Sequence, residues 1–177
     1  MMRFLSGLLA ALFALPALAL DLQSTFTNID GGSHRLSDWS GQPVLVVNTA
    51  SMCGFTGQYD ALQTLYDTYR ERGLVVLAVP SDDFRQELAS NDEVKDFCAV
   101  NFDLTLPMTG ITAVRGPEAH PFYRSVASEA GFTPSWNFNK ILLGPDGTVV
   151  ATYGAPVEPM SPEITGAIEK LLAGAGG

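Results

Sequence analysis

Hydrophobic residues follow two different spacings near the middle of this chain, and together they predict a βαβ unit. Val44–Val47 is a continuous aliphatic run, which is typical of a strand buried on both faces. Leucine and tyrosine residues between 62 and 69 then recur at the spacing of one helix face, and Gly73 follows as a terminating residue. Leu74–Val79 is a second apolar run. A strand, a helix and a strand in close succession predict a parallel pair with a right-handed crossover.

The rest of the pattern adds hairpins and helices to this unit. Gly31-Gly32 and Gly144–Gly147 each separate two short strand-like segments, as tight turns do. In chain order we expect a hairpin over 26–36, helices over 91–100 and 118–130, a hairpin over 140–153 and a helix from Ser161. This order predicts an α/β fold in which helices flank both faces of a central mixed β-sheet, with an N-terminal β-hairpin.

Residues 1–19 have the three-part pattern of a secretory signal peptide. Arg3 gives a positive start, an apolar run follows, and small residues precede the expected cleavage site after Ala19. The alternative is an uncleaved membrane anchor, but the apolar run is shorter than the roughly 20 residues that span a bilayer. We therefore expect an exported protein, periplasmic or secreted, that does not bind a membrane after cleavage.

Length and charge narrow the function further. The chain has 177 residues, of which 46% are hydrophobic, and its formal net charge is −9. One domain over residues 20–177 accounts for this length, because domains commonly span about 100–200 residues. Nucleic-acid binding is not expected, because an acidic surface repels phosphate. The histidines lack the spacing of a metal site, and no cofactor is predicted.

Cys53 is the strongest candidate for chemistry. It follows the first buried strand at the C-terminal edge of the predicted parallel pair, where open α/β folds place their sites. Free backbone N–H groups at the start of the next helix favour a thiolate there. Thr56 stands where a disulfide exchanger carries a second cysteine. A single reactive thiolate suits attack on an electrophile such as a peroxide oxygen, which produces a sulfenic acid.

The residues around Cys53 closely resemble a known active-site signature. Val47–Tyr59 resembles the signature of glutathione peroxidases, and Ser135–Lys140 is similar to that family's Trp-Asn-Phe-x-Lys motif. Gly73–Pro80 and Asp96–Phe102 also resemble segments of the family. The resemblance implies a thioredoxin fold and the thiol-dependent reduction of hydrogen peroxide and organic hydroperoxides.

The resemblance also implies an active-site group of cysteine or selenocysteine, glutamine, tryptophan and asparagine. Cys53, Trp136 and Asn137 match three of these. The indole and amide N–H groups are donors that can support a thiolate and a leaving oxygen. Asp83 stands at the glutamine position, and an ionised carboxylate cannot donate and disfavours a nearby thiolate. Asp83→Gln should then speed oxidation, unless Gln86 substitutes or Asp83 is neutral or points away.

Cys98 matches the resolving cysteine of family members that use thioredoxin. A disulfide with Cys53 needs Cα atoms within about 7 Å, so the fold or a partial unwinding of the helix must bring the two together. A permanent disulfide in an oxidising compartment and an inert core thiol are the alternatives.

Partners follow from the same resemblance. We expect a thioredoxin-like dithiol as the reductant, because glutathione is anionic like this surface and Cys98 offers an internal disulfide. Residues 130–135 are too few for the extra loop of tetrameric members, which predicts a monomer. Arg115 and Lys140 are expected to be surface charges.

Two functions remain open at this point. One is a thiol peroxidase, and the other is a thioredoxin-fold redox or binding domain whose peroxidase activity is weak or lost because of Asp83. A copper-handling protein of this fold would need a Cys-x-x-x-Cys motif, which the sequence lacks. Peroxide-dependent oxidation of a reduced thiol donor separates the first two.

Overall fold

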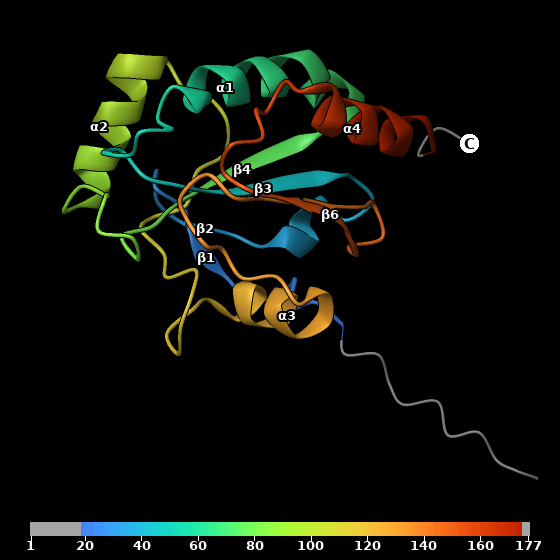
Figure 1. Ribbon diagram of the computed structural model, residues 1–177, viewed down its shortest axis with the longest axis horizontal. Helices are drawn as coiled ribbons and strands as arrows, with labels where there is room; N and C mark the ends of the chain where they lie inside the picture. The colour runs from blue at the N-terminus through green and yellow to red at the C-terminus, as the bar shows by residue number, and fades with distance from the viewer. Residues whose placement is uncertain (1–18, 175–177) are drawn as a thin grey trace, which may run out of the picture.

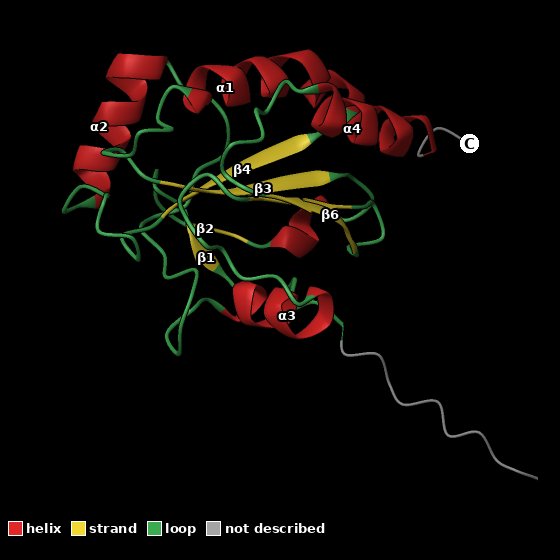
Figure 2. Cartoon of the chain, in the orientation of Figure 1, coloured by secondary structure: helices red, strands yellow, loops and turns green. Residues whose placement is uncertain are grey.

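The computed structural model describes residues 19–174, so the predicted signal peptide falls almost entirely outside the described residues. Four strands form a central sheet in the order β4-β3-β5-β6, and β1 and β2 form a separate hairpin. The strands are β1 (Phe26–Thr27), β2 (Ser33–His34), β3 (Val44–Thr49), β4 (Val75–Pro80), β5 (Lys140–Leu143) and β6 (Val149–Tyr153). β3 pairs with β4 in parallel (Figure 2) and with β5 in antiparallel orientation, so the sheet is mixed, as predicted.

Helices cover both faces of this sheet. The α-helices are α1 (Gln58–Tyr69), α2 (Asn91–Phe102), α3 (Pro121–Ala130) and α4 (Pro162–Gly174), and two 3₁₀ turns span η1 (Leu36–Trp39) and η2 (Arg70–Arg72). Figure 1 shows α1, α2 and α4 on one side of the sheet and α3 with the β1–β2 hairpin on the other. Within residues 19–174, no helix has the length and apolar character needed to cross a membrane.

The apolar run of β3 is continuous because each of its faces meets a different core. Leu45 and Val47 pack with side chains of α1, α2 and α4, whereas Val44 and Val46 pack with side chains of α3. This alternation is the period of two along a strand. Each fully buried aliphatic side chain contributes about 1.5–3 kcal/mol, so the two covered faces hold β3 in the centre of the fold.

Several predicted boundaries differ from those of the structure by a few residues, and two of the differences have a clear physical cause. α3 begins at Pro121 and not at residue 118, because His120 acts as its N-cap and a ring nitrogen accepts the Phe122 N–H at 3.3 Å. Pro121 then occupies the first helical position, where its missing N–H costs nothing. Pro80 is the last residue of β4 and not a residue beyond it, which the edge position of β4 in the sheet allows.

Candidate active site

Cys53 lies in the turn that joins β3 to α1. Its side chain is 6% exposed, and the Phe55 backbone N–H donates to its Sγ at 3.5 Å. Thr56 closes the turn, because both its hydroxyl and its N–H donate to the Cys53 carbonyl. The turn therefore presents a backbone donor to the sulfur, as expected for a thiol before the N-terminus of a helix.

Trp136 and Asn137 immediately precede β5, and this places them at the same sheet edge as Cys53. β5 runs antiparallel to β3 with Val47 opposite Lys140, so the start of β5 meets the end of β3. The Trp136 side chain is 40% exposed and its ring centroid lies 5.4 Å from that of Phe84, whereas Asn137 is fully buried. The structure thus brings two N–H donors and a thiol from distant parts of the chain to one edge.

Two asparagines hold the tryptophan in place. The Nδ2 atoms of Asn48 and Asn139 donate to the Trp136 carbonyl at 3.0 and 2.9 Å. Phe138 adopts a left-handed backbone with φ of 60°, which is strained for a bulky residue, and its N–H donates to the Asn48 carbonyl at 2.5 Å. Its ring packs edge-on against Tyr59, with centroids 5.2 Å apart. This turn therefore connects the site directly to the core.

Residues 86 and 87, here called the 86–87 segment, connect the two halves of the site. The Gln86 side-chain Oε1 accepts from Asn137 Nδ2 at 3.0 Å, and its backbone carbonyl accepts from the Met52 N–H at 2.8 Å. Glu87 Oε1 accepts from the Ser51 N–H at 3.0 Å. The segment therefore holds the backbone just before Cys53 and the side chain of Asn137 at the same time.

Asp83 is turned toward a different loop. Its Oδ2 accepts from the backbone N–H groups of Val114 and Arg115, at 2.6 and 3.0 Å. Among the described residues it makes no hydrogen bond to Cys53 or Asn137, so the geometry corresponds to the alternative in which Asp83 points away. These two backbone N–H groups account for the orientation of Asp83, because they satisfy the charge of its carboxylate. The glutamine that is usual in the family carries no such charge.

Cys98 lies on α2 and is 2% exposed. Cys53, Cys98 and Tyr59 belong to one core cluster, and both cysteines are free thiols. The structure therefore shows no disulfide between them. Burial, and to a smaller extent the charge of Glu87, raise the pKa of the Cys98 thiol to about 11, so it is protonated near neutral pH.

The chain is similar to known proteins over most of its length. The sequence model of the family described as glutathione peroxidase matches residues 22–127. The chain belongs to the glutathione peroxidase family. A glutathione peroxidase from Lactococcus lactis subsp. cremoris is 40% identical over 149 residues, which cover 81% of this chain and 94% of the relative. A protein from Synechocystis sp. named hydroperoxy fatty acid reductase is also 40% identical, over 155 residues that cover 81% of this chain and 90% of the relative.

Solved structures give the same family and confirm the thioredoxin fold. The apo crystal structure of Trgpx superposes with a TM-score of 0.69 at 29% identity, over 88% of this chain and 97% of that chain. The thioredoxin domain of an oxidoreductase from Bacteroides vulgatus superposes with a TM-score of 0.59 at 16% identity, over 90% and 99% of the two chains. The second likeness shows the fold alone. Membership of this family makes the chain an oxidoreductase of the peroxidase class.

The family's motif lysine corrects one sequence-based expectation. Lys140 is fully buried and is not a surface charge. Its Nζ donates to Gln58 Oε1 at 2.6 Å and to the carbonyls of Val157 and Ala155 at 2.5 and 3.3 Å. Burial lowers the pKa of this amine to about 8. Lys140 therefore joins the start of β5, the first residue of α1 and the loop after β6, whereas Arg115 is exposed as expected.

Several residues that build the site escaped the sequence analysis. Glu87, Asn48 and Asn139 act through backbone groups, and Gln86 was considered only as a substitute for Asp83. The signal available in the sequence was their position: each is a polar residue within a few positions of a strand end or of the tryptophan motif. Within the described residues, no group of three or more His, Cys, Asp or Glu side chains could hold a metal ion.

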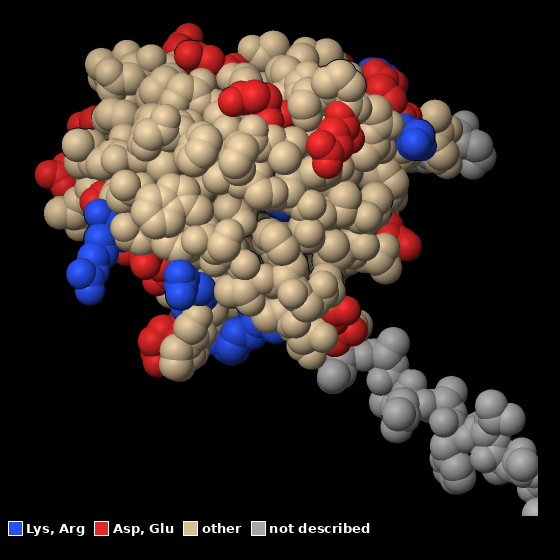
Figure 3. Space-filling view, viewed as in Figure 1, with Lys and Arg blue, Asp and Glu red and all other residues tan. Residues whose placement is uncertain are grey.

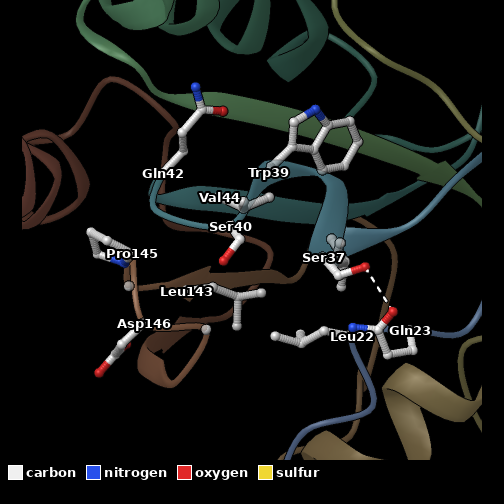
Figure 4. A pocket seen from close by; sticks show the side chains of 13 residues that line it. Leu22, Gln23, Ser37, Trp39, Ser40, Gln42, Val44, Leu143, Pro145 and Asp146 are labelled. Carbon is white, nitrogen blue, oxygen red and sulfur yellow. Dashed lines mark hydrogen bonds between the residues drawn. The ribbon is translucent and has the colours of Figure 1, made fainter.

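A pocket lies at the opposite end of the sheet from Cys53. Trp39, Gln42, Val44 and Leu143 contribute to its lining, and at its wall the Ser37 hydroxyl donates to Gln23 Oε1 at 3.1 Å (Figure 4). It contains no thiol and none of the site residues. Acidic side chains are scattered over the face shown in Figure 3, as the net charge of −9 requires.

Proposed function

We propose that this protein is a thiol peroxidase that reduces hydrogen peroxide and organic hydroperoxides through a sulfenic acid at Cys53. One observation carries the proposal: Cys53 receives a backbone N–H at its sulfur and lies at the same sheet edge as Trp136 and Asn137. The test is peroxide-dependent oxidation of a reduced thiol donor by the purified protein. If Cys53 is reduced and peroxide is not consumed, the alternative of a redox or binding domain without peroxidase activity replaces this proposal.

The first chemical step is displacement at a peroxide oxygen. The Cys53 thiolate forms an S–O bond, the O–O bond breaks, and the leaving oxygen departs with a proton as water or an alcohol. Trp136 and Asn137 supply N–H donors for the negative charge that develops on that oxygen. Asn137 Nδ2 uses one of its two hydrogens for Gln86, so only the second hydrogen could serve a substrate, and the side chain is buried in this structure.

Gln86 is proposed to supply the amide that Asp83 lacks. Its side-chain Oε1 accepts from Asn137, and its backbone carbonyl accepts from the Met52 N–H just before Cys53. We expect Gln86→Met to slow the second-order oxidation of Cys53 by about tenfold to a hundredfold, the effect of losing one donor to a developing oxyanion. The control is Asp83→Asn, which should change the rate by less than about twofold because Asp83 faces another loop. Stopped-flow oxidation by hydrogen peroxide measures both. The opposite ranking of the two variants would contradict the assignment.

The proposed reductant is a thioredoxin-like dithiol, with Cys98 as the resolving cysteine. Cys98 lies in the same core cluster as Cys53, which supports an internal disulfide formed after a rearrangement of α2. Cys98→Ala should lose turnover with a thioredoxin and thioredoxin reductase system but retain one reduction of peroxide per molecule. Coupled NADPH oxidation measures this. Equal turnover with glutathione, undiminished in the variant, would argue for a glutathione-dependent enzyme.

Organic hydroperoxides, fatty acid hydroperoxides among them, are proposed substrates. The Synechocystis relative is named for this activity, and two apolar residues at the sheet edge of the thiol, Met52 and Trp136, are 64% and 40% exposed. An exposed apolar rim favours a substrate with a hydrocarbon chain over one without.

Export and a monomeric state complete the proposal. The pattern of residues 1–19 supports cleavage after Ala19, and Edman or mass-spectrometric analysis of the mature N-terminus tests it. The short 130–135 segment supports a monomer, which light scattering at micromolar concentration tests.

A further inference from the structure

We propose that Arg115 binds the carboxylate of a fatty acid hydroperoxide whose peroxide group reacts at Cys53. The proposal rests on the peroxidase function proposed above and names the substrate class of that same site. It gives a role in specificity to an exposed arginine that the reaction at the thiol does not use.

Two ring contacts connect Arg115 to the edge of the active site. Its guanidinium carbon Cζ lies 5.2 Å from the centroid of the Phe84 ring, within the range of a cation–π contact. The Phe84 ring lies in turn 5.4 Å from the Trp136 ring, measured between centroids. A cation, a phenyl ring and the tryptophan of the site therefore form one continuous series, called here the Arg115–Phe84–Trp136 row.

The backbone that carries Arg115 is held in place. The Asp83 carboxylate accepts the N–H groups of Val114 and Arg115 at 2.6 and 3.0 Å. The Val114 side chain is buried in the core that includes the side chains of α3, and Phe84 packs against the same core. The guanidinium is therefore presented from a fixed loop, which lowers the entropy cost of binding a ligand there.

The charge of Arg115 is available to an anion. The side chain is exposed, and within the described residues no ion pair includes its guanidinium. The Asp83 carboxylate lies close to it in the fold but directs Oδ2 at the two backbone N–H groups. A guanidinium is planar and pairs with a carboxylate through two parallel hydrogen bonds, so a carboxylate is the ligand that this side chain fits.

The rest of the row fits the hydrocarbon chain of a fatty acid. Phe84 is half-buried and Trp136 is 40% exposed, so both offer apolar surface between the guanidinium and the sheet edge of Cys53. Methylene groups that lie on these rings leave water, which favours binding. The net charge of −9 repels an anion over most of the surface, so the contact with Arg115 selects the orientation in which the carboxylate lies away from the thiol.

The test compares two peroxides that differ in charge, linoleic acid hydroperoxide and its methyl ester. Reduced full-length protein is mixed with each in the same neutral detergent and without a reductant. The reaction is quenched with a thiol-alkylating reagent, and mass spectrometry measures the loss of the Cys53 thiol. The decisive quantity is the ratio of the second-order rate constants for the acid and for the ester. In Arg115→Met this ratio should fall by about three- to tenfold, the effect of losing an exposed pair with a carboxylate.

Two further variants serve as controls. Arg115→Lys should retain part of the ratio, because lysine keeps the charge but lacks the planar pair of donors. Lys170→Met removes an equal charge from an exposed position on α4 and should keep the wild-type ratio. A fall of the same size in Lys170→Met would overturn the proposal, because the net charge and not Arg115 would then set the preference.

Each other outcome has a definite meaning. An unchanged ratio in Arg115→Met overturns the role of Arg115, while oxidation of Cys53 by the peroxides leaves the peroxidase function standing. Equal slowing with the acid, the ester and hydrogen peroxide also overturns it, because Arg115 would then act on Trp136 through Phe84. If Arg115→Met slows only the reduction of the oxidised protein by glutathione, the arginine serves the carboxylates of a thiol and the proposal fails. If no peroxide oxidises Cys53 in the wild type, the proposed function and this inference fail together.

Discussion

Replacing Cys53 with serine should reduce peroxide turnover by at least about a thousandfold, the scale of losing a catalytic nucleophile. The change keeps the size of the side chain and the turn that Thr56 closes, so the fold should persist. The hydroxyl cannot act as the nucleophile, because its alkoxide is inaccessible near neutral pH and the single Phe55 N–H is too weak a donor to change that. The measurement is peroxide consumption with a reduced dithiol in excess.

The matched control is Cys98→Ser, which removes the other thiol and leaves the first reaction in place. One equivalent of peroxide should disappear in the control and none in Cys53→Ser. Retained consumption in Cys53→Ser would place the reactive group elsewhere in the chain and refute the proposed chemistry.

The buried amine of Lys140 should make the free energy of unfolding rise with pH between about 8 and 10.5. Burial lowers the pKa of its amine to about 8 in the folded protein, whereas an unfolded lysine has a pKa near its model value of 10.5. Between these values the unfolded chain binds a proton that the folded chain does not, so the free energy of unfolding increases with pH. The full penalty applies below pH 8, where folding buries a charged amine, and the gain across the range should approach about 3 kcal/mol.

Lys140→Met removes this dependence because methionine does not titrate. The variant also leaves the Val157 carbonyl without its donor, which should lower stability by about 1–3 kcal/mol where the wild-type amine is neutral. Urea unfolding of both proteins from pH 7 to 10 measures the two effects. Lys170→Met on α4 is the control, since this side chain is exposed. Parallel pH curves for the wild type and Lys140→Met would show that the buried amine titrates normally.

The positions of the central strands and of Cys53 could be predicted because local patterns determine them. β3 must be apolar on both faces, and the residues around Cys53 follow directly from its end, so strand, thiol and helix form one continuous pattern. The thioredoxin fold and the peroxidase class followed from the motifs on that pattern.

Tertiary contacts decided what the sequence did not reveal. The 86–87 segment acts through backbone bonds to residues 51 and 52, and no side-chain pattern encodes such bonds. Lysine is normally exposed, so only the convergence of carbonyl oxygens around Lys140 explains its burial. The orientation of Asp83 depends on two N–H groups of a loop about 30 residues away, which the chain brings close only after folding.

The left-handed backbone of Phe138 limits how this site can change in evolution or by design. Glycine would relieve the strain at φ 60°, but it would remove the ring that packs against Tyr59 and open a cavity beside the core. Asparagine tolerates the backbone but would bury an unsatisfied amide. Neither common remedy for a strained turn is therefore open at position 138. Stabilising substitutions have to be sought elsewhere, because here the best backbone and the best packing require different residues.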